Sequence, residues 1–366
     1  MTDLENARLV INDIDKEMAR LFEKRMEAVR TVAEYKRLNG VRVTDAAREA
    51  EVIRRNAKLV EDEALRPYYV DFLQNTMEVS KAYQHRLLEG MRVAYSGVEG
   101  AFANIAAKRV FPDAIAVPHG DFKSAYDAVV NGACDCVILP IENSYNGDVG
   151  QVMDLLFFGP LYINGIYDIA VVQNLLAVKG TTMDEVRQVI SHPQALGQCA
   201  AYIRRHGFET VEAVNTAVAA QQVAEWGRHD IAAIGSSEAA AQFGLKKLEA
   251  HINESGSNTT RFAVFSKVPK APGKADNQFI MLFTVPNEAG ALGEAVAAIG
   301  RYGFNLRALK SRPTKELIWS YYFYAEGEGN IDSEKGREML QCLKEKCSTI
   351  RVVGSFEKEI ELKEDV

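Results

Sequence analysis

Apolar residues recur at helical spacing through the first ninety residues of the chain, and proline and glycine are almost absent there. This pattern predicts three helices, at about residues 3–39, 44–62 and 66–89. The first helix would be more than about 50 Å long at 1.5 Å per residue. Two shorter helices cannot cover the apolar face of so long a helix, so we expect this region to form an intertwined dimer.

The pattern changes from Met91 to about Lys267, where short apolar runs alternate with amphipathic segments. The apolar runs predict strands at MRVAYSG, AIAVPH, CVILPIEN, QVISHP, ETVEAV, IAAIGS and RFAVFS. The intervening segments predict helices at FANIAAKRVF, SAYDAVVNG, QALGQCAAYIRRHG and TAVAAQQVAEWG. Strands and helices in alternation indicate a parallel sheet with helices on both faces, and this length allows two α/β lobes with a cleft between them.

The segment VPKAPGKADN, residues 268–277, is the clearest linker in the chain. After it the pattern predicts a strand, a helix, two strands, a helix and a strand. This βαββαβ order is typical of a small α+β module of the ferredoxin-like kind. The sequence therefore predicts three domains: an all-α domain at residues 1–90, a two-lobed α/β domain at 91–267 and an α+β domain at 278–366.

Composition narrows the range of partners. With 47% apolar and 25% charged residues, the 366-residue chain has the balance of a soluble globular protein. Its net charge of -7 gives no overall positive field that would attract nucleic acid or anionic lipid. The five cysteines contain no C-x-x-C pair, and no signal peptide or membrane-spanning stretch is evident. We therefore expect a cytoplasmic protein that needs no metal or cofactor and that binds a small molecule or a second copy of itself.

Each of the three predicted helices carries polar residues on the face that packing would reserve for apolar ones. They are Arg25 and Lys36 in the first helix, Asp45, Arg48 and Glu49 in the second, and Ser80 and Gln84 in the third. One such helix could be explained by charged side chains snorkelling at the rim, but three together favour a shared polar pocket. With Arg8, four positive and two negative charges sum to +2, which suits a small dicarboxylate held by arginine forks.

These polar positions give residues 4–88 a resemblance to the all-helical chorismate mutase domain. The matching stretches are ARLVINDID, FEKRMEAV, AEYKRL, VTDAAREAEV and SKAYQ. The resemblance implies an intertwined dimer, in which Arg8 reaches into the partner's site, and the rearrangement of chorismate to prephenate. This pericyclic reaction needs no nucleophile, metal or proton shuttle, because catalysis rests on holding the substrate compactly and stabilising charge on its ether oxygen.

The resemblance also implies roles for these residues. Lys36 and Gln84 would lie at the ether oxygen, and Glu49 at the ring hydroxyl. The remaining substrate-binding residues would be Arg8, Arg25 and Arg48 at the carboxylates, with Asp45 and Ser80 beside them.

The middle region resembles a prephenate dehydratase. The resemblance rests on VAYSGVEGAFANIAA, LPIENSYNGDVGQVMDLL, SHPQALGQC, NTAVAAQQVA and NTTRFAVF, which occur in the order and approximate spacing of that family. It implies a two-lobed fold like that of periplasmic binding proteins and the conversion of prephenate to phenylpyruvate with loss of carbon dioxide and hydroxide. Thr260 would assist the departure of hydroxide, and the residues holding the substrate and Thr260 itself would be Asn143, Ser191, Gln198 and Arg261. This chain has Ala101 and Ala103 where the family commonly has two hydroxyl residues.

The carboxy-terminal region resembles an ACT domain of the kind that binds phenylalanine. The resemblance implies an effector site made of Gly290, Ala291, Leu292, Asn305, Leu306, Ser311, Arg312 and Pro313. A helix amino terminus such as the one predicted at Gly290 is suited to an amino-acid carboxylate. The second signature begins with Lys310 here, where the family usually has glutamate.

Together the three regions resemble the bifunctional chorismate mutase/prephenate dehydratases of phenylalanine biosynthesis, and they imply feedback inhibition by phenylalanine. Three alternatives stay open. The chain could be a non-catalytic or mutase-only amino-acid sensor whose dehydratase cleft has degenerated, as the two alanines would allow. It could be a cytosolic amino-acid-binding protein related to periplasmic binders. Finally, the helical region could serve dimerisation alone.

Overall fold

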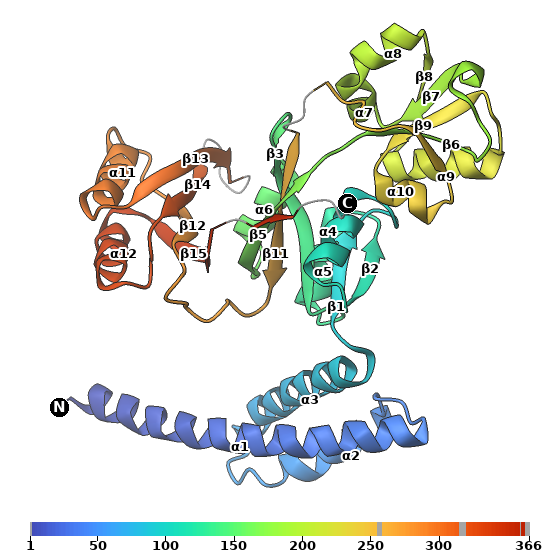
Figure 1. Ribbon diagram of the computed structural model, residues 1–366. Coiled ribbons are helices and arrows are strands. Elements are labelled where there is room, and N and C mark those ends of the chain that lie inside the picture. The colour runs from blue at the N-terminus through green and yellow to red at the C-terminus, as the bar shows by residue number, and fades with distance from the viewer. Residues whose placement is uncertain (1, 255–257, 315–319, 359, 363–366) are drawn as a thin grey trace. The chain divides into compact units, whose positions relative to one another are not determined.

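The computed structural model describes residues 2–254, 258–314, 320–358 and 360–362. The chain divides into two compact units, Met1–Met91 and Arg92–Val366. Each unit has its own hydrogen-bonded framework, labelled by element in Figure 1. In the described parts of the chain, no helix is both long enough and apolar enough to cross a membrane.

The first unit consists of α1 (Asp3–Asn39), α2 (Ala46–Ala57) and α3 (Arg66–Glu89). Thr2 and Glu5 form a capping box at the start of α1, and Gly40 ends the helix in the left-handed conformation, with φ of 63°. The predicted bounds of the first and third helices agree with the structure. The second helix is shorter than the predicted 44–62, because Asp45 caps it and the chain turns after Ala57.

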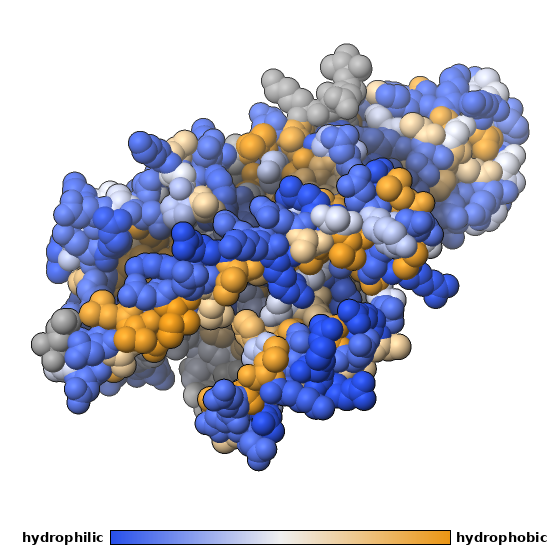
Figure 2. Space-filling model, turned by 90° about the horizontal axis from the view of Figure 1, so that it is seen from below, coloured by the Kyte–Doolittle hydropathy of each residue, from blue (hydrophilic) through white to orange (hydrophobic). Residues whose placement is uncertain are grey.

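Much of the apolar face of α1 is uncovered within one copy of the chain. Only Val29 and Ala33 of this helix are buried. The exposed apolar residues of its amino-terminal part are Leu4, Leu9, Val10, Ile11, Ile14, Met18, Leu21 and Phe22, each between 43% and 59% exposed. Figure 2 shows hydrophobic side chains reaching the molecular surface between hydrophilic ones. A continuous uncovered face is what an intertwined dimer requires, and the dimer stays a prediction.

The first lobe of the second unit is built on a seven-stranded sheet of order β16-β5-β11-β3-β1-β2, with β4 beside β3. Its strands are β1 (Arg92–Ser96), β2 (Ile115–His119), β3 (Cys136–Asn143), β4 (Gly147–Asp148), β5 (Tyr162–Ala170), β11 (Thr259–Ser266) and β16 (Ile360–Leu362). Its helices are α4 (Phe102–Val110), α5 (Phe122–Val130) and α6 (Gly150–Phe158).

The second lobe has a five-stranded sheet of order β10-β6-β9-β7-β8. Its strands are β6 (Asn174–Ala177), β7 (Gln188–Ser191), β8 (Glu209–Glu212), β9 (Ile231–Gly235) and β10 (Lys246–Glu249). Its helices are the 3-10 turn η1 (Met183–Glu185), α7 (Pro193–Gln198), α8 (Ala200–His206), α9 (Thr216–Trp226) and α10 (Ser237–Gln242).

Both sheets are mixed, so the expected all-parallel sheet is wrong. Strand β1 runs parallel to β2 and β3, whereas β11 runs antiparallel to β3 and β5. The sequence analysis did not predict the helices α6 and α10 or the strands β5, β6 and β10. Strands β5 and β6 follow one another where the chain passes from the first lobe to the second. Because the chain leaves the first lobe along β5 and returns along β11, these two neighbouring strands must run in opposite directions.

A third, antiparallel sheet of order β13-β14-β12-β15 follows the second lobe in sequence. Its elements are β12 (Gln278–Thr284), α11 (Ala291–Arg301), β13 (Asn305–Pro313), β14 (Tyr321–Glu328), α12 (Glu334–Lys346) and β15 (Thr349–Phe356). This is the predicted order of elements. One face packs against α11 and α12, and the other shares a hydrophobic core with the first lobe through side chains such as Tyr322 and Tyr324.

Candidate active sites

Arg25 of α1 and Ser80 of α3 form the centre of the polar cluster in the helical unit. The Arg25 guanidinium donates to the Ser80 hydroxyl and, at 3.4 Å, to the main-chain oxygen of Thr76. Ser80 is only 4% exposed. Burial lowers the pKa of Arg25, although an arginine keeps its charge throughout the physiological range. The structure therefore holds one fixed cation at the contact between α1 and α3.

Gln84 and Lys36 bring further hydrogen-bonding groups to this unit. The Gln84 amide donates to the main-chain oxygen of Ser80 at 3.3 Å. Its Oε1 is buried without a hydrogen-bond partner in the part of the chain that the structure describes. Lys36 Nζ donates to the main-chain oxygen of Val43 at 2.7 Å. An unsatisfied buried acceptor and a lysine that donates to a main-chain carbonyl are groups that a polar ligand can engage.

Glu49 is tied to α3 by a residue that the sequence analysis missed. Its carboxylate lies 3.0 Å from Lys81 Nζ, and Lys81 also lies 2.6 Å from Glu78. The hydrogen bond to Glu78, with that to Glu49, raises the pKa of Lys81 against the effect of burial. Lys81 follows Ser80 directly, so the available signal was a cation beside the predicted polar stripe.

The contacts of the other three predicted residues of this unit within one copy of the chain are different. Asp45 caps α2 by accepting from the Arg48 main-chain N–H at 3.0 Å, and Arg48 forms an ion pair with Glu51 at 2.8 Å. Arg8 is exposed and lies on the same continuous helix as Arg25, about 26 Å away along the axis at 1.5 Å per residue. Within one copy of the chain, Arg8 therefore cannot reach a small molecule that contacts Arg25.

In the second unit, strand pairing brings Thr260 of β11 directly opposite Asn143 of β3. Asn143 Nδ2 donates to Thr260 Oγ1 at 2.9 Å and to Asn258 Oδ1 at 2.9 Å. Asn143 Oδ1 accepts two main-chain N–H groups at 3.1 Å, which settles the orientation of the amide. Because the Thr260 oxygen accepts from Asn143, its own proton is left to donate elsewhere.

A cavity of about 160 Å³ lies next to this pair and is lined from both lobes. Gln198 at the end of α7 lines it from the second lobe, and Tyr145 and Asn258 line it from the first. Oε1 of Gln198 and Nδ2 of Asn258 are buried without partners among the described residues. Asn258 was not predicted, although it belongs to the NTTRF stretch that carries Thr260. Ser191 is fully buried at the end of β7 and donates to the main-chain oxygen of Ile234 at 2.7 Å.

The two sets of motifs correspond to two known families. Residues 7–85 match the family model of chorismate mutase type II, and residues 93–270 match that of prephenate dehydratase. The Arabidopsis thaliana protein named arogenate dehydratase/prephenate dehydratase 2, chloroplastic, is 33% identical over 311 residues, covering 82% of this chain and 80% of that one. The chain belongs to the prephenate dehydratase family. It carries a chorismate mutase domain of type II ahead of the dehydratase domain.

Two further similarities extend across the C-terminal region. A bifunctional chorismate mutase/prephenate dehydratase of Aquifex aeolicus is 29% identical and matches 98% of this chain and 99% of its own length. The solved prephenate dehydratase of Arthrobacter aurescens in complex with L-Phe matches 73% of this chain and 90% of that one, at 25% identity and a TM-score of 0.68. The resemblance to the bifunctional enzymes is therefore confirmed.

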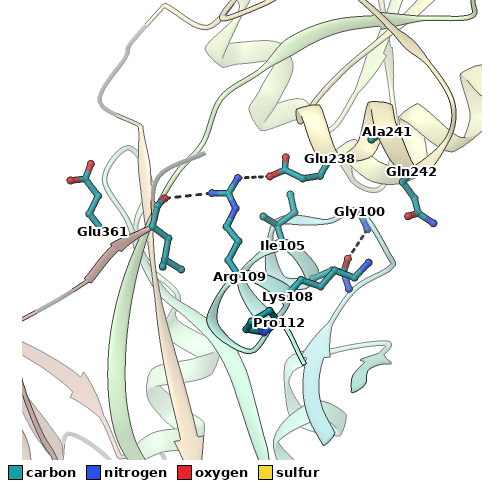
Figure 3. A pocket seen from close by; sticks show the side chains of 11 residues that line it. Gly100, Ile105, Lys108, Arg109, Pro112, Glu238, Ala241, Gln242 and Glu361 are labelled. Atoms are coloured by element: carbon teal, nitrogen blue, oxygen red, sulfur yellow. Dashed lines mark hydrogen bonds and ion pairs between the residues drawn. The ribbon is translucent and has the colours of Figure 1, made fainter. Parts of the chain in front are cut away.

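The two alanines of the dehydratase domain lie at the start of α4. Ala101 is the N-cap residue and offers no side-chain acceptor, and Ala103 is buried. A larger cavity of about 760 Å³ adjoins this helix, where Arg109 reaches between Glu238 and the main-chain oxygen of Leu362 (Figure 3). None of the predicted catalytic or binding residues lines it. The smaller cavity beside Asn143 and Thr260 is therefore the better candidate for the dehydratase site.

Arg261 does not face that cavity. Neighbouring residues of a strand point to opposite faces, so Arg261 lies on the other side of β11 from Thr260. It lies 2.9 Å from Glu142 of β3 and 3.0 Å from Glu326 of β14. Burial alone would lower the pKa of Arg261, but the charge of Glu326 raises it. Direct contact of Arg261 with a substrate in that cavity, one of its two predicted roles, does not agree with this position, and its role in holding Thr260 stays a prediction.

The predicted effector residues open α11 and form β13. Gly290 is the N-cap of α11, in the left-handed conformation with φ of 91°, and Ala291 and Leu292 follow it. The remaining ones, Asn305, Leu306, Ser311, Arg312 and Pro313, belong to β13, the edge strand that contacts α11. Arg312 is turned toward the dehydratase domain, where its Nε lies 2.9 Å from Asp154 of α6.

Proposed function

We propose that the helical unit converts chorismate to prephenate and that the two-lobed domain converts prephenate to phenylpyruvate. These are consecutive steps in phenylalanine biosynthesis. The observation that supports this most directly is the hydrogen bond from Asn143 to Thr260, which lies beside a cavity shared by both lobes. Neither reaction calls for a metal or cofactor.

In the first reaction, the enzyme holds the dicarboxylate in the compact shape of the transition state. Arg25 and Arg48 bind the carboxylates, while Ser80 holds the Arg25 guanidinium and Asp45 shapes the start of α2. Lys36 and Gln84 stabilise the negative charge that develops on the ether oxygen. Glu49, held by Lys81, accepts from the ring hydroxyl.

In the second reaction, the ring carboxylate leaves as carbon dioxide and its bonding electron pair enters the ring. The ring hydroxyl leaves at the same time, and the ring becomes aromatic. Thr260 donates a proton to the departing oxygen, so that water is released, and regains a proton from solvent. Asn143 holds the Thr260 oxygen so that its proton points to the substrate, and Gln198 holds the substrate from the second lobe. Ser191 holds the end of β7 in place through its hydrogen bond to Ile234.

The site of the first reaction is completed by a second copy of the chain. In the proposed homodimer, the uncovered face of α1 packs against its counterpart, and Arg8 enters the partner's site. Arg8 and Arg25 lie about 26 Å apart along α1, so one copy of the chain cannot place both arginines on one substrate. This distance supports the proposed exchange.

Phenylalanine binds at α11 and β13 between paired C-terminal domains, and it lowers dehydratase activity by favouring a closed state of the two lobes. The L-Phe in the Arthrobacter aurescens complex supports this ligand.

One assay tests these proposals. The purified protein is given chorismate without any cofactor, and chorismate, prephenate and phenylpyruvate are followed separately, with and without phenylalanine. Accumulation of phenylpyruvate supports both activities. Prephenate that goes no further supports the alternative of a mutase with a degenerate dehydratase cleft, and untouched chorismate contradicts the mutase. Because the Arabidopsis relative is also named for arogenate, the assay is repeated with that substrate.

A further inference from the structure

A group of charged residues joins the catalytic strands of the dehydratase to the third sheet. Glu142 precedes Asn143 in β3, and Arg261 follows Thr260 in β11. The strand register pairs Arg261 with Glu142 just as it pairs Thr260 with Asn143. The two pairs point to opposite faces of the sheet. The uncharged pair is on the side of Asn258, which Asn143 contacts and which lines the cavity, and the charged pair is on the side of the third sheet.

The third sheet contributes two ionic partners to this charged pair. Glu326 of β14 accepts from both terminal nitrogens of Arg261, at 3.0 and 3.1 Å. Lys310 of β13 donates to Glu142 at 2.9 Å and also contacts Asp148 of β4. Each member of the charged pair is therefore held by a different strand of the C-terminal domain.

These contacts are largely shielded from water, so they are sensitive to the loss of one partner. Glu326 is buried, and the hydroxyl of Tyr324 donates to the same carboxylate. Removing one member of a buried ion pair leaves an uncompensated charge, which costs far more than losing an exposed pair. Loss of Lys310 removes one of the cations that contact Glu142 and a cation that contacts Asp148, so the strands that carry these carboxylates shift to admit water.

The charged forms are the stable ones at neutral pH. Burial would raise the pKa of Glu142, but the hydrogen bonds from Lys310 and Arg261 lower it. Burial likewise would lower the pKa of Lys310, but its hydrogen bonds to Asp148 and Glu142 raise it. Both side chains are therefore ionised, and they attract each other across the boundary between the two domains.

We propose that Lys310 and Glu326 are positioning residues of the dehydratase. Acting through Glu142 and Arg261, they fix β3 and β11 against each other and thereby set the hydrogen bond between Asn143 and Thr260. The C-terminal domain is then part of the structure that orients the catalytic hydroxyl, whether or not an effector is bound. This inference rests on the proposed dehydratase activity.

The test compares two single substitutions in the full chain, each of which removes a contact between the C-terminal and dehydratase domains. Lys310→Met removes the ion pair to the catalytic strand. The matched control is Arg351→Met, because Arg351 of β15 donates to the main-chain oxygens of Gly159 and Leu161 in the loop after α6. kcat and KM for prephenate are measured for both variants, together with the thermal unfolding midpoint.

We expect Lys310→Met to lower kcat about tenfold. Lys310 does not contact the substrate in this proposal, but its loss misplaces the catalytic Thr260 hydroxyl, and misplacement of a catalytic group lowers the rate. KM should stay within about twofold, since the substrate-binding groups are unchanged. Lys310→Arg should restore most of kcat, and Arg351→Met should leave kcat unchanged even if it lowers the unfolding midpoint.

A double substitution separates positioning from general destabilisation. Glu142→Gln alone should lower kcat at least as much as Lys310→Met, and the combined variant should lose much less than the product of the two effects. Multiplicative losses, an unaffected Lys310→Met variant, or an equal loss of kcat in Arg351→Met would each overturn the inference. If the unsubstituted protein does not convert prephenate, the proposed function itself fails, and this inference fails with it.

Discussion

Lys81 of α3 lies 3.0 Å from the carboxylate of Glu49 in α2. The ion pair joins two helices at a place where both side chains are largely buried, with 17% and 26% of their surfaces exposed. It limits the directions in which the Glu49 carboxylate can point. A glutamate held in this way is prepared to accept a hydrogen bond from a substrate hydroxyl.

Replacing Lys81 by methionine should therefore impair the mutase selectively. We expect kcat/KM for chorismate to fall about tenfold, because Glu49 loses its fixed position. Dehydratase activity on prephenate, measured on the same preparation, should not change. The control is Lys16→Met, which removes an exposed ion pair with Asp13 on α1 and should leave both activities intact. Equal activity of the two variants would show that Lys81 has no role in the site.

The proposed exchange of Arg8 between subunits predicts complementation. Arg8→Ala and Arg25→Ala should each abolish most mutase activity as homodimers, because every site lacks one arginine. When the two variants are unfolded together and refolded, each mixed dimer has one site with both arginines and one with neither. Mutase activity should then reappear in the mixture. No recovery, despite mixed dimers detected by mass spectrometry, would contradict the exchange.

The role of the Thr260 hydroxyl can be tested with two substitutions of similar size. Thr260→Val keeps the shape of the side chain but replaces the hydroxyl, the proposed proton donor, by a methyl group. It should lower dehydratase kcat by about a hundredfold or more. Thr260→Ser keeps the hydroxyl and should retain a substantial part of the rate. The mutase activity of each variant, measured on the same preparation, shows whether the rest of the protein is intact. A valine variant with unchanged kcat would assign proton donation to another group.

Helix α4 begins at Ala101 without a capping side chain, so we expect that adding one would stabilise the protein. Ala101 has the extended conformation of an N-cap residue, with φ of -72° and ψ of 157°. A serine there can accept from a free N–H of the first turn, so Ala101→Ser should stabilise the dehydratase domain by about 0.5 to 1 kcal/mol. Chemical unfolding of the full chain measures the difference. An unchanged or lower free energy of unfolding would mean that the hydroxyl does not reach the helix.

The helical unit was the part most accessible to sequence reasoning. Its long apolar period and its few helix-breaking residues predicted α1 and α3 correctly, because local spacing determines where a helix can bury a face. Lys81 was missed for a related reason. A lysine next to a polar stripe is indistinguishable from a solvated one until the packing of α2 against α3 brings Glu49 to it.

The missed strands depended on contacts that are distant in the chain. Strand β5 contains Asn164, Gly165 and Asp168, so its sequence does not form an apolar run. It is a strand because β11 and β16, far away in sequence, pair with it on both sides. The orientation of Arg261 depended in the same way on Glu326 of the third sheet, which no local pattern could bring beside the Thr-Arg-Phe triplet.

The position of β16 affects how the dehydratase domain is made and where it can be cut. Residues 267–359 separate β11 from β16, so the first sheet lacks its last strand until the ribosome has also synthesised the C-terminal domain. A chain ended at residue 270, where the match to the dehydratase family stops, would leave β5 with a row of unpaired main-chain groups. Removing the C-terminal domain thus also exposes a strand edge in the dehydratase, so truncation alone cannot separate the proposed regulatory role of that domain from aggregation.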